Sequence, residues 1–308
     1  MKNEVVFEEI TGKVIASIEA GVAPWRQTWG FVEPPQNYFS GHQYRGINAF
    51  LIFFKQYPTP YFATFNQITK NGGKVKKGSK AHRLYFSKNL WYDSKGNEYH
   101  EADFENMPPH VRNDLRRIYY IKFDMVFNMA DTEGIELKPF STAWNENDSY
   151  AEVDYFFENL KDKPTIDVKL SDYAYYSKTK DLLNMPLIQQ FETSNNFYAV
   201  AFHELIHSTG HPKRLNRPTL AEQHQFGDEN YSKEELVAEL GACFLCNAFG
   251  IANVDITGIS AAYLKSWLKV LKAEPKLLWE AAAEAQKAFD FLIKQVPEFS
   301  TLTKPNHA

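Results

Sequence analysis

The stretch FYAVAFHELIHSTGHPKRL, residues 197 to 215, contains a His-Glu-x-x-His set inside an apolar run that is typical of a helix. His203 and His207 are four residues apart, so in a helix both imidazoles project from one face. Two imidazoles on one face can converge on a single ion. In such a helix the faces away from the histidines are apolar.

Flanking residues predict where this helix begins and ends. Ser194 or Asn195 is placed to cap its start, since short polar side chains accept hydrogen bonds from the first free backbone N–H groups. Gly210 followed by Pro212 predicts the end of the helix just past the motif.

Glu204 lies beside the two histidines, where it can contact a metal-bound water rather than the metal. Zinc held by three protein ligands keeps a fourth position for water, whose pKa falls to about 7, and a neighbouring carboxylate can accept the proton. The motif therefore predicts one zinc ion per chain and a metallopeptidase with Glu204 as general base. The alternative is a chance match on a helix that binds no metal.

The third ligand must come from another segment, and the run SKEELVAEL offers Glu234, Glu235 and Glu239. Glu235 and Glu239 share a helix face because they differ by four. Glu235 follows His207 by 28 residues, enough for a loop and the start of an antiparallel helix. We expect Glu235 to bind the metal and Glu239 to support a ligand histidine from the outer shell. His211 is the competing ligand, although the predicted helix end turns it away.

Charge is distributed unevenly, although the net charge is only −4. Between Glu33 and Asp93 there is no acidic residue, while the same window holds nine Lys and Arg residues and fourteen aromatic residues. Basic residues follow a phosphate backbone, and aromatic faces stack on unpaired bases. This mixture predicts binding to single-stranded nucleic acid. The alternative is that the aromatic residues form a core and the lysines only solvate its surface.

Some residues of this window are candidates for contact with the strand. The candidate cations are Arg45, Lys74, Lys76, Lys77 and Lys80. The candidate stacking residues are Tyr44 and Phe65.

Pattern and composition predict an α+β protein with two domains, over residues 1–140 and 150–308, joined by a linker at 141–149. The first half contains a helix and then strand-like runs such as TPYFATF, HRLYFSKNLWY and YYIKFDMVFNM, with NGGKVKKGSK as a flexible basic loop. The polar stretch from Asp93 to Arg117 is expected to be a surface excursion between strands. The second half is mostly helical, with TIDVKL as a strand and AYYSKTKDLLNMP as a hairpin.

The sequence shows no apolar run that could span a bilayer, and its start is acidic rather than signal-like. We therefore expect a soluble cytoplasmic protein without a membrane partner. The two cysteines, Cys243 and Cys246, lie in a helical pattern and are expected to be buried thiols.

Several separate motifs in the same order resemble ArdC-type antirestriction proteins. In the first half these are GVAPWRQTW, NYFSGHQYRGINAFLI, FATFNQITKNGGKVKKGSKA and VFNMADTEGI. In the second half they are AYYSKTKDLLNMP, HELIHSTGHPKRL and FGDENYSKEELVAELGACFL. Ser208 stands where the family often has an aromatic residue, and the 93–117 segment is longer than the minimal form of the domain.

The resemblance implies an N-terminal domain that binds single-stranded DNA and a C-terminal zincin-like metallopeptidase domain of the gluzincin type. It also implies that the protein is carried by a mobile element such as a plasmid and protects incoming DNA from host restriction. The expected protein substrate is a restriction subunit or another DNA-binding protein. Two alternatives are a DNA-coating protein with a structural or vestigial zinc site and a repair protease that acts on proteins crosslinked to DNA.

Overall fold

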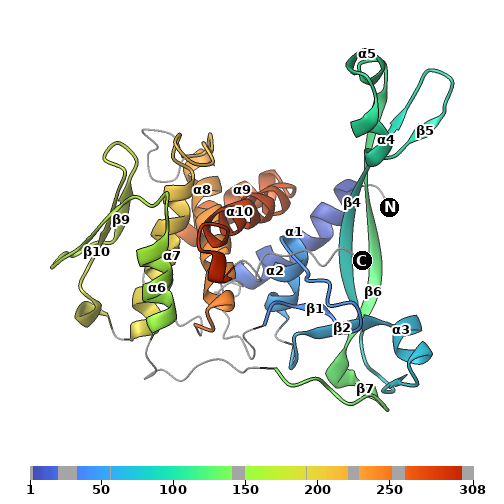
Figure 1. Cartoon of the computed structure of the whole chain (residues 1–308), viewed down its shortest axis with the longest axis horizontal. Coiled ribbons are helices and arrows are strands. Elements are labelled where there is room, and N and C mark those ends of the chain that lie inside the picture. The colour runs from blue at the N-terminus through green and yellow to red at the C-terminus, as the bar shows by residue number, and fades with distance from the viewer. Residues whose placement is uncertain are drawn as a thin grey trace.

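The computed structural model describes residues 3–19, 33–55, 57–140, 150–191, 193–220, 229–251 and 261–299. Helices and strands are mixed in the N-terminal half, whereas helices dominate the C-terminal half (Figure 1). The predicted linker at 141–149 and the motif at 21–29 lie outside the described residues. No helix among the described residues is both long enough and apolar enough to cross a bilayer.

The N-terminal half is built around a five-stranded sheet in the order β1-β2-β6-β4-β5. Its strands are β1 (Gln36–Asn37), β2 (Tyr61–Thr64), β4 (His82–Tyr92), β5 (Glu98–Tyr99) and β6 (Arg116–Asn128). A separate short ladder joins β3 (Lys74–Val75) to β7 (Thr132–Glu133). The helices of this half are α1 (Asn3–Glu19), α2 (Ile47–Phe54), α3 (Phe65–Lys70), α4 (Glu101–Asn106) and α5 (Pro109–Arg112).

The two long strands of this sheet form an antiparallel ribbon. β4 and β6 pair continuously from His82 with Val126 to Tyr92 with Arg116. Figure 1 shows this ribbon extending away from the helices, with β5, α4 and α5 at its far end. The predicted surface excursion between strands is therefore confirmed.

Two predictions for this half were incomplete. The strand expected from TPYFATF stops at Thr64, because the Thr64 side chain accepts a hydrogen bond from the backbone N–H of Gln67 and the Gln67 side chain accepts one from the backbone N–H of Thr64. This capping box starts α3 at Phe65. The basic loop is not wholly irregular, since Lys74 and Val75 pair with β7.

The C-terminal half contains a small sheet and five helices among its described residues. The sheet has the order β8-β10-β9, with β8 (Thr165–Val168) parallel and β9 (Tyr175–Ser177) antiparallel to β10 (Leu182–Met185). The helices are α6 (Ala151–Asn159), α7 (Ser194–Thr209), α8 (Glu229–Ala248), α9 (Ala261–Ala273) and α10 (Leu277–Ile293). The predicted strand and hairpin are both present.

The two halves share one hydrophobic cluster. The buried face of α1, including Ile10, Val14 and Ile18, belongs to the same cluster as the buried faces of α7, α8 and α10. Polar contacts join the halves as well: Thr11 Oγ1 donates to the carbonyl of Pro275, and the backbone N–H of Gly46 donates to Gln286. The N-terminal half is thus packed directly on the helices that support the C-terminal half.

Candidate metal centre

The helix that carries the His-Glu-x-x-His set is α7, and its ends follow from local chemistry. Thr193, rather than the expected Ser194 or Asn195, caps its start by accepting a hydrogen bond from the backbone N–H of Asn196. Gly210 is its C-cap, as predicted. Because α7 is continuous between these ends, the spacing of four places the two imidazoles on one face, with ring centroids 4.7 Å apart.

α8 packs against α7 and supplies a carboxylate to this face. The approach is close at Gly241, where an added Cβ atom would lie only 2.7 Å from the Cδ1 atom of Ile206. Since Ile206 directly precedes His207, this contact between the helices lies next to the histidines. A side chain at position 241 would push the helices apart.

His203, His207 and Glu235 converge in three dimensions. Each offers a ligand atom, and these atoms all lie within 4.8 Å of one another. The Nε2 atoms of the two histidines are 3.1 Å apart, and each lies 3.4 Å from an Oε atom of Glu235. Ligand atoms on a tetrahedral zinc, at roughly 2.0–2.1 Å from the ion, are separated by about 3.3 Å. The donor set and its spacing therefore fit a zinc ion.

Electrostatics favour positive charge at this point. Burial opposes a charged imidazole at His207, but the carboxylates of Glu235 and Glu234 outweigh it and raise the pKa of His207 well above its ordinary value. Burial also opposes charge on Glu235, and the two imidazoles outweigh it and lower the pKa of that carboxyl. The three side chains are only 10–14% exposed, so little solvent screens these interactions.

Glu204 and His211 occupy different positions from the three converging residues. Glu204 follows His203 on α7 and is partly exposed. Its carboxylate acts electrostatically on His207. His211 follows the helix end and accepts a hydrogen bond from the backbone N–H of Lys213. It does not belong to the converging group that the described residues form.

A second layer of charged groups surrounds the histidines. Glu239 Oε1 lies 3.8 Å from His203 Nδ1, on the side of the ring away from Glu235. Glu234 Oε1 lies 3.3 Å from His207 Nδ1. Arg217 is only 4% exposed and forms an ion pair with Glu234. Burial opposes charge on Glu234, but hydrogen bonds and charge from His207 and Arg217 outweigh this effect and lower the pKa of Glu234 to about 2.

Sequence reasoning did not assign a role to Glu234 or Arg217. Glu234 and Glu235 are neighbours on α8, so helical periodicity gives no reason for both to face one imidazole. Arg217 lies beyond the helix end, in a loop whose path no periodic pattern predicts. For Glu234, the signal in the sequence was its place in the charged run SKEEL.

The candidate DNA-contacting residues are divided between two places. Four of them are exposed: Phe65 at the start of α3, which is 56% exposed, Lys74 in β3, and Lys77 and Lys80 in the segment after β3. Lys76 lies in the same segment, is exposed and donates to the carbonyl of Ala130. We call these five exposed residues, which all lie within residues 65–80, the lysine surface.

Tyr44 and Arg45 are not on the lysine surface. Tyr44 is only 5% exposed, and burial raises its pKa to about 12. Its ring makes an edge contact with the ring of Phe62. Arg45 forms an ion pair with Asp290 of α10. Both residues thus take part in contacts within the protein and do not lie on the lysine surface.

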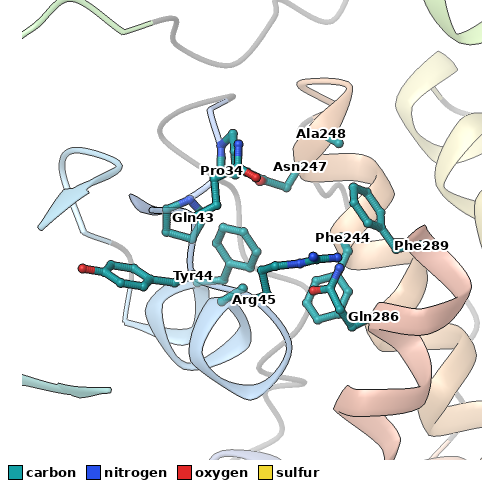
Figure 2. Close-up of a pocket in the computed structure, with 12 residues that line it drawn as sticks. Pro34, Gln43, Tyr44, Arg45, Phe244, Asn247, Ala248, Gln286 and Phe289 are labelled. Atoms are coloured by element: carbon teal, nitrogen blue, oxygen red, sulfur yellow. The ribbon is translucent and has the colours of Figure 1, made fainter. Parts of the chain in front are cut away.

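Arg45 lines a pocket between the two halves. Figure 2 shows its side chain extending from the N-terminal half toward Gln286 and Phe244. The cavity encloses only about 40 Å³, which leaves room for no more than a few waters. We therefore assign this pocket to the contact between the halves and not to a ligand.

Comparison with known proteins adds an independent line of evidence. A family model described as the N-terminal domain of the anti-restriction factor ArdC matches residues 4–127, and a zincin-like metallopeptidase model matches residues 151–284. The DNA primase TraC of Escherichia coli is 31% identical over 96% of this chain, but the chain spans only 28% of that relative.

Solved structures match over nearly the full length of both chains. The metal-free crystal structure of the antirestriction ArdC protein from the R388 plasmid has a TM-score of 0.75 and 32% identity, with 95% of this chain and 98% of that chain covered. The Mn(II)-bound structure of the same protein has a TM-score of 0.71 and 32% identity over 94% and 97% of the two chains. The chain therefore belongs to the ArdC family of antirestriction proteins and contains a zincin-like metallopeptidase domain.

Proposed function

We propose that this protein binds single-stranded DNA and uses a zinc-dependent peptidase site to protect incoming DNA from restriction. One observation carries the peptidase half of the proposal: two imidazole nitrogens lie 3.1 Å apart, and each lies 3.4 Å from one of the two oxygens of a single, largely buried carboxylate. Burying these polar groups together costs free energy unless they bind an ion, so their convergence supports a metal site.

His203, His207 and Glu235 would hold the zinc, one ion per chain. Zinc bound in such a site lowers the pKa of a coordinated water and polarises the peptide carbonyl. Glu204 would act as general base, accepting a proton at its carboxylate when water attacks and returning it to the leaving amine. Glu239 would orient His203 from the Nδ1 side of its ring.

The lysine surface supports the DNA-binding half of the proposal. Lys74, Lys77 and Lys80 are exposed cations close together in the chain, and the ring of Phe65, in the preceding helix, is exposed as well. Cations attract the phosphate backbone, and an exposed ring can stack only on an unpaired base. In this proposal the lysine surface contacts the single strand. The substrate of the peptidase site is a restriction subunit or another DNA-binding protein.

A single variant separates chemistry from binding. Glu204→Gln should keep the metal, because Glu204 is not a ligand, and should lose peptide hydrolysis by at least about a hundredfold. Glu152→Gln, on the exposed surface of α6, is the matched control and should behave as wild type. Full hydrolysis by the Glu204 variant would disprove the assigned base.

Protection is then measured in cells by transferring unmodified DNA as a single strand into a restricting host. If the peptidase acts in protection, Glu204→Gln should fail to protect while binding single-stranded DNA normally in vitro. Full protection by this variant would favour DNA coating over proteolysis. Loss of both protection and DNA binding would point to misfolding, which circular dichroism detects.

A further inference from the structure

One face of the β4–β6 ribbon combines cations and aromatic rings. Residues opposite each other in an antiparallel pair point to the same side. The pairing of Phe86 with Lys122, of Lys88 with Tyr120 and of Tyr92 with Arg116 therefore places six side chains on one face. Residues of the alternate set, such as Tyr85 and Ile121, belong to the main hydrophobic cluster on the other side.

This face is open to a ligand. Lys88, Arg116 and Lys122 are exposed, and Tyr92 and Tyr120 are partly exposed. The Nζ atom of Lys122 lies 5.5 Å from the centre of the Tyr120 ring, within the range of a cation–π contact. Cations with interleaved rings form the kind of surface along which a single strand can lie.

A pocket lies at the inner end of this face. It has a volume of about 280 Å³ and is lined by Phe86 and Asp124 of the ribbon, by the ring of Tyr44 and by polar residues that include Asn37, His42 and Gln67. This volume is close to the lower end of the range for small-molecule sites, roughly 300 Å³. The pocket therefore suits a flat group of the size of a nucleobase better than a long peptide.

The polar wall of the pocket is fixed before any ligand binds. The Asn37 side chain is 8% exposed, donates to Gln67 Oε1 at 3.0 Å and accepts from the backbone N–H of Ser40 at 3.0 Å. Gln67 is itself held by the capping box with Thr64. Because these groups satisfy one another, the exposed side chains of Asp124 and His42 are the polar groups of the lining that are placed to contact a ligand, and of the two Asp124 is the pure acceptor.

Asp124 has an unusual setting. From the pair Leu84–Asp124 to the pair Tyr92–Arg116 it is the one acidic residue on its face of the ribbon. Apart from Leu84 and the pair Leu90–Ile118, the other residues of that face are cations and rings. A carboxylate repels phosphate but accepts hydrogen bonds from base N–H groups. Guanine is the base that offers two adjacent N–H donors on its Watson–Crick edge, matching the two oxygens of a carboxylate, whereas thymine presents a single N–H between two carbonyls.

We propose that this pocket accepts a guanine base from single-stranded DNA whose backbone follows the cations of the ribbon, with Asp124 bound to the Watson–Crick edge and Phe86 against the ring. This inference rests on the proposed binding of single-stranded DNA and adds a preference for one base. It assigns the ribbon, in addition to the lysine surface, to the path of the strand.

The test measures the affinity of the full-length protein for three short oligonucleotides: oligothymidylate, the same strand with one central guanine, and the same strand with hypoxanthine at that position. Wild type should bind the guanine strand at least about fivefold more tightly than oligothymidylate, as expected for one bidentate base contact. Hypoxanthine lacks the exocyclic amino group and should lose part of this gain. Asp124→Asn should abolish the preference while still binding oligothymidylate.

Glu136→Gln is the matched control, since Glu136 is an exposed acid of the same half and its change removes the same charge. It should retain the guanine preference. If Asp124→Asn tightens binding to all three strands equally, Asp124 acts only as a repulsive charge and the pocket is overturned. Equal wild-type affinity for all three strands overturns the pocket but leaves the DNA-binding half of the proposed function intact. Failure of wild type to bind any strand overturns both.

Discussion

The Nδ1 atom of His207 lies 3.3 Å from the Oε1 atom of Glu234, while the Nε2 atom of the same ring faces Glu235. A carboxylate at Nδ1 holds the proton on that nitrogen and leaves the lone pair of Nε2 free for a metal. Arg217 and Thr219 hold the Glu234 carboxylate in place. The loop after α7 is thereby connected to the candidate ligand through one buried acid.

Removing this buried support should weaken metal binding without abolishing it. We expect Glu234→Gln and Arg217→Met each to lower metal affinity by about 10- to 100-fold, because outer-shell partners orient the ligand ring. Competition with a chromophoric chelator measures the affinity. Lys213→Met, at an exposed position of the same loop, is the control and should bind metal as wild type does. Wild-type affinity in folded Glu234→Gln would remove Glu234 from the metal centre.

The ligand assignment predicts a ranking among four variants. His203→Ala, His207→Ala and Glu235→Ala should each reduce the metal content of purified protein from about one ion per chain to near zero, because two remaining ligands make an inadequate site. Glu239→Ala should retain metal with reduced affinity. Elemental analysis gives the stoichiometry. If Glu239→Ala loses the metal and Glu235→Ala keeps it, the two roles are exchanged.

The lysine surface should reveal itself in the salt dependence of DNA binding. For a single strand the log–log slope changes by about 0.7 per phosphate neutralised, so replacing Lys74, Lys76 and Lys77 by Ala should flatten it by up to roughly 2 units. Fluorescence anisotropy at several salt concentrations measures the slope. Metal content should not change, since these residues lie in the other half.

The control is a triple variant that loses three lysine charges in the C-terminal half. Lys161, Lys180 and Lys294 are exposed in the C-terminal half, and their joint replacement by Ala should leave the slope unaltered. Equal slopes for the two triple variants would show that the lysine surface only solvates its segment.

Asp181 links pH to stability at a distance from the metal ligands. It accepts hydrogen bonds from the side chains of Tyr176 and Arg214. The Arg214 side chain is 3% exposed, and it also donates to the carbonyl of Ser208, so it joins the β9–β10 turn to the end of α7. Burial opposes charge on Asp181, but these partners outweigh it and lower its pKa. A lowered pKa means that the stabilisation is complete above the ordinary value of about 3.9 and is lost as pH falls below it.

Asp181→Asn should therefore lower the free energy of unfolding by about 1.5–3 kcal/mol at pH 7, and the difference from wild type should shrink below about pH 4. Urea unfolding at several pH values measures both. Asp172→Asn, a nearby exposed position, should show no such dependence. A difference that stayed constant down to pH 3 would mean that the Asp181 charge does not contribute.

Local patterns predicted much of the candidate metal centre because they depend only on backbone geometry. The spacing of His203 and His207 places them on one face of any helix, and Gly210 ends that helix for a local reason. The long strands and the β9–β10 hairpin follow equally from short-range alternation and turns. None of these needs knowledge of the rest of the chain.

Only the tertiary structure decided which distant groups meet. The packing of α8 on α7 at Gly241 selects the acids that face the histidines and places Glu234 on His207, which helical periodicity does not specify. The docking of the two halves buries Tyr44 and pairs Arg45 with Asp290, although sequence composition favoured both for DNA. Strand register brings Lys122 and Asp124, from outside the acid-free window, onto the same face as Phe86. The reason is physical: periodicity fixes the direction of a side chain within its own element, whereas packing and register fix what that side chain meets.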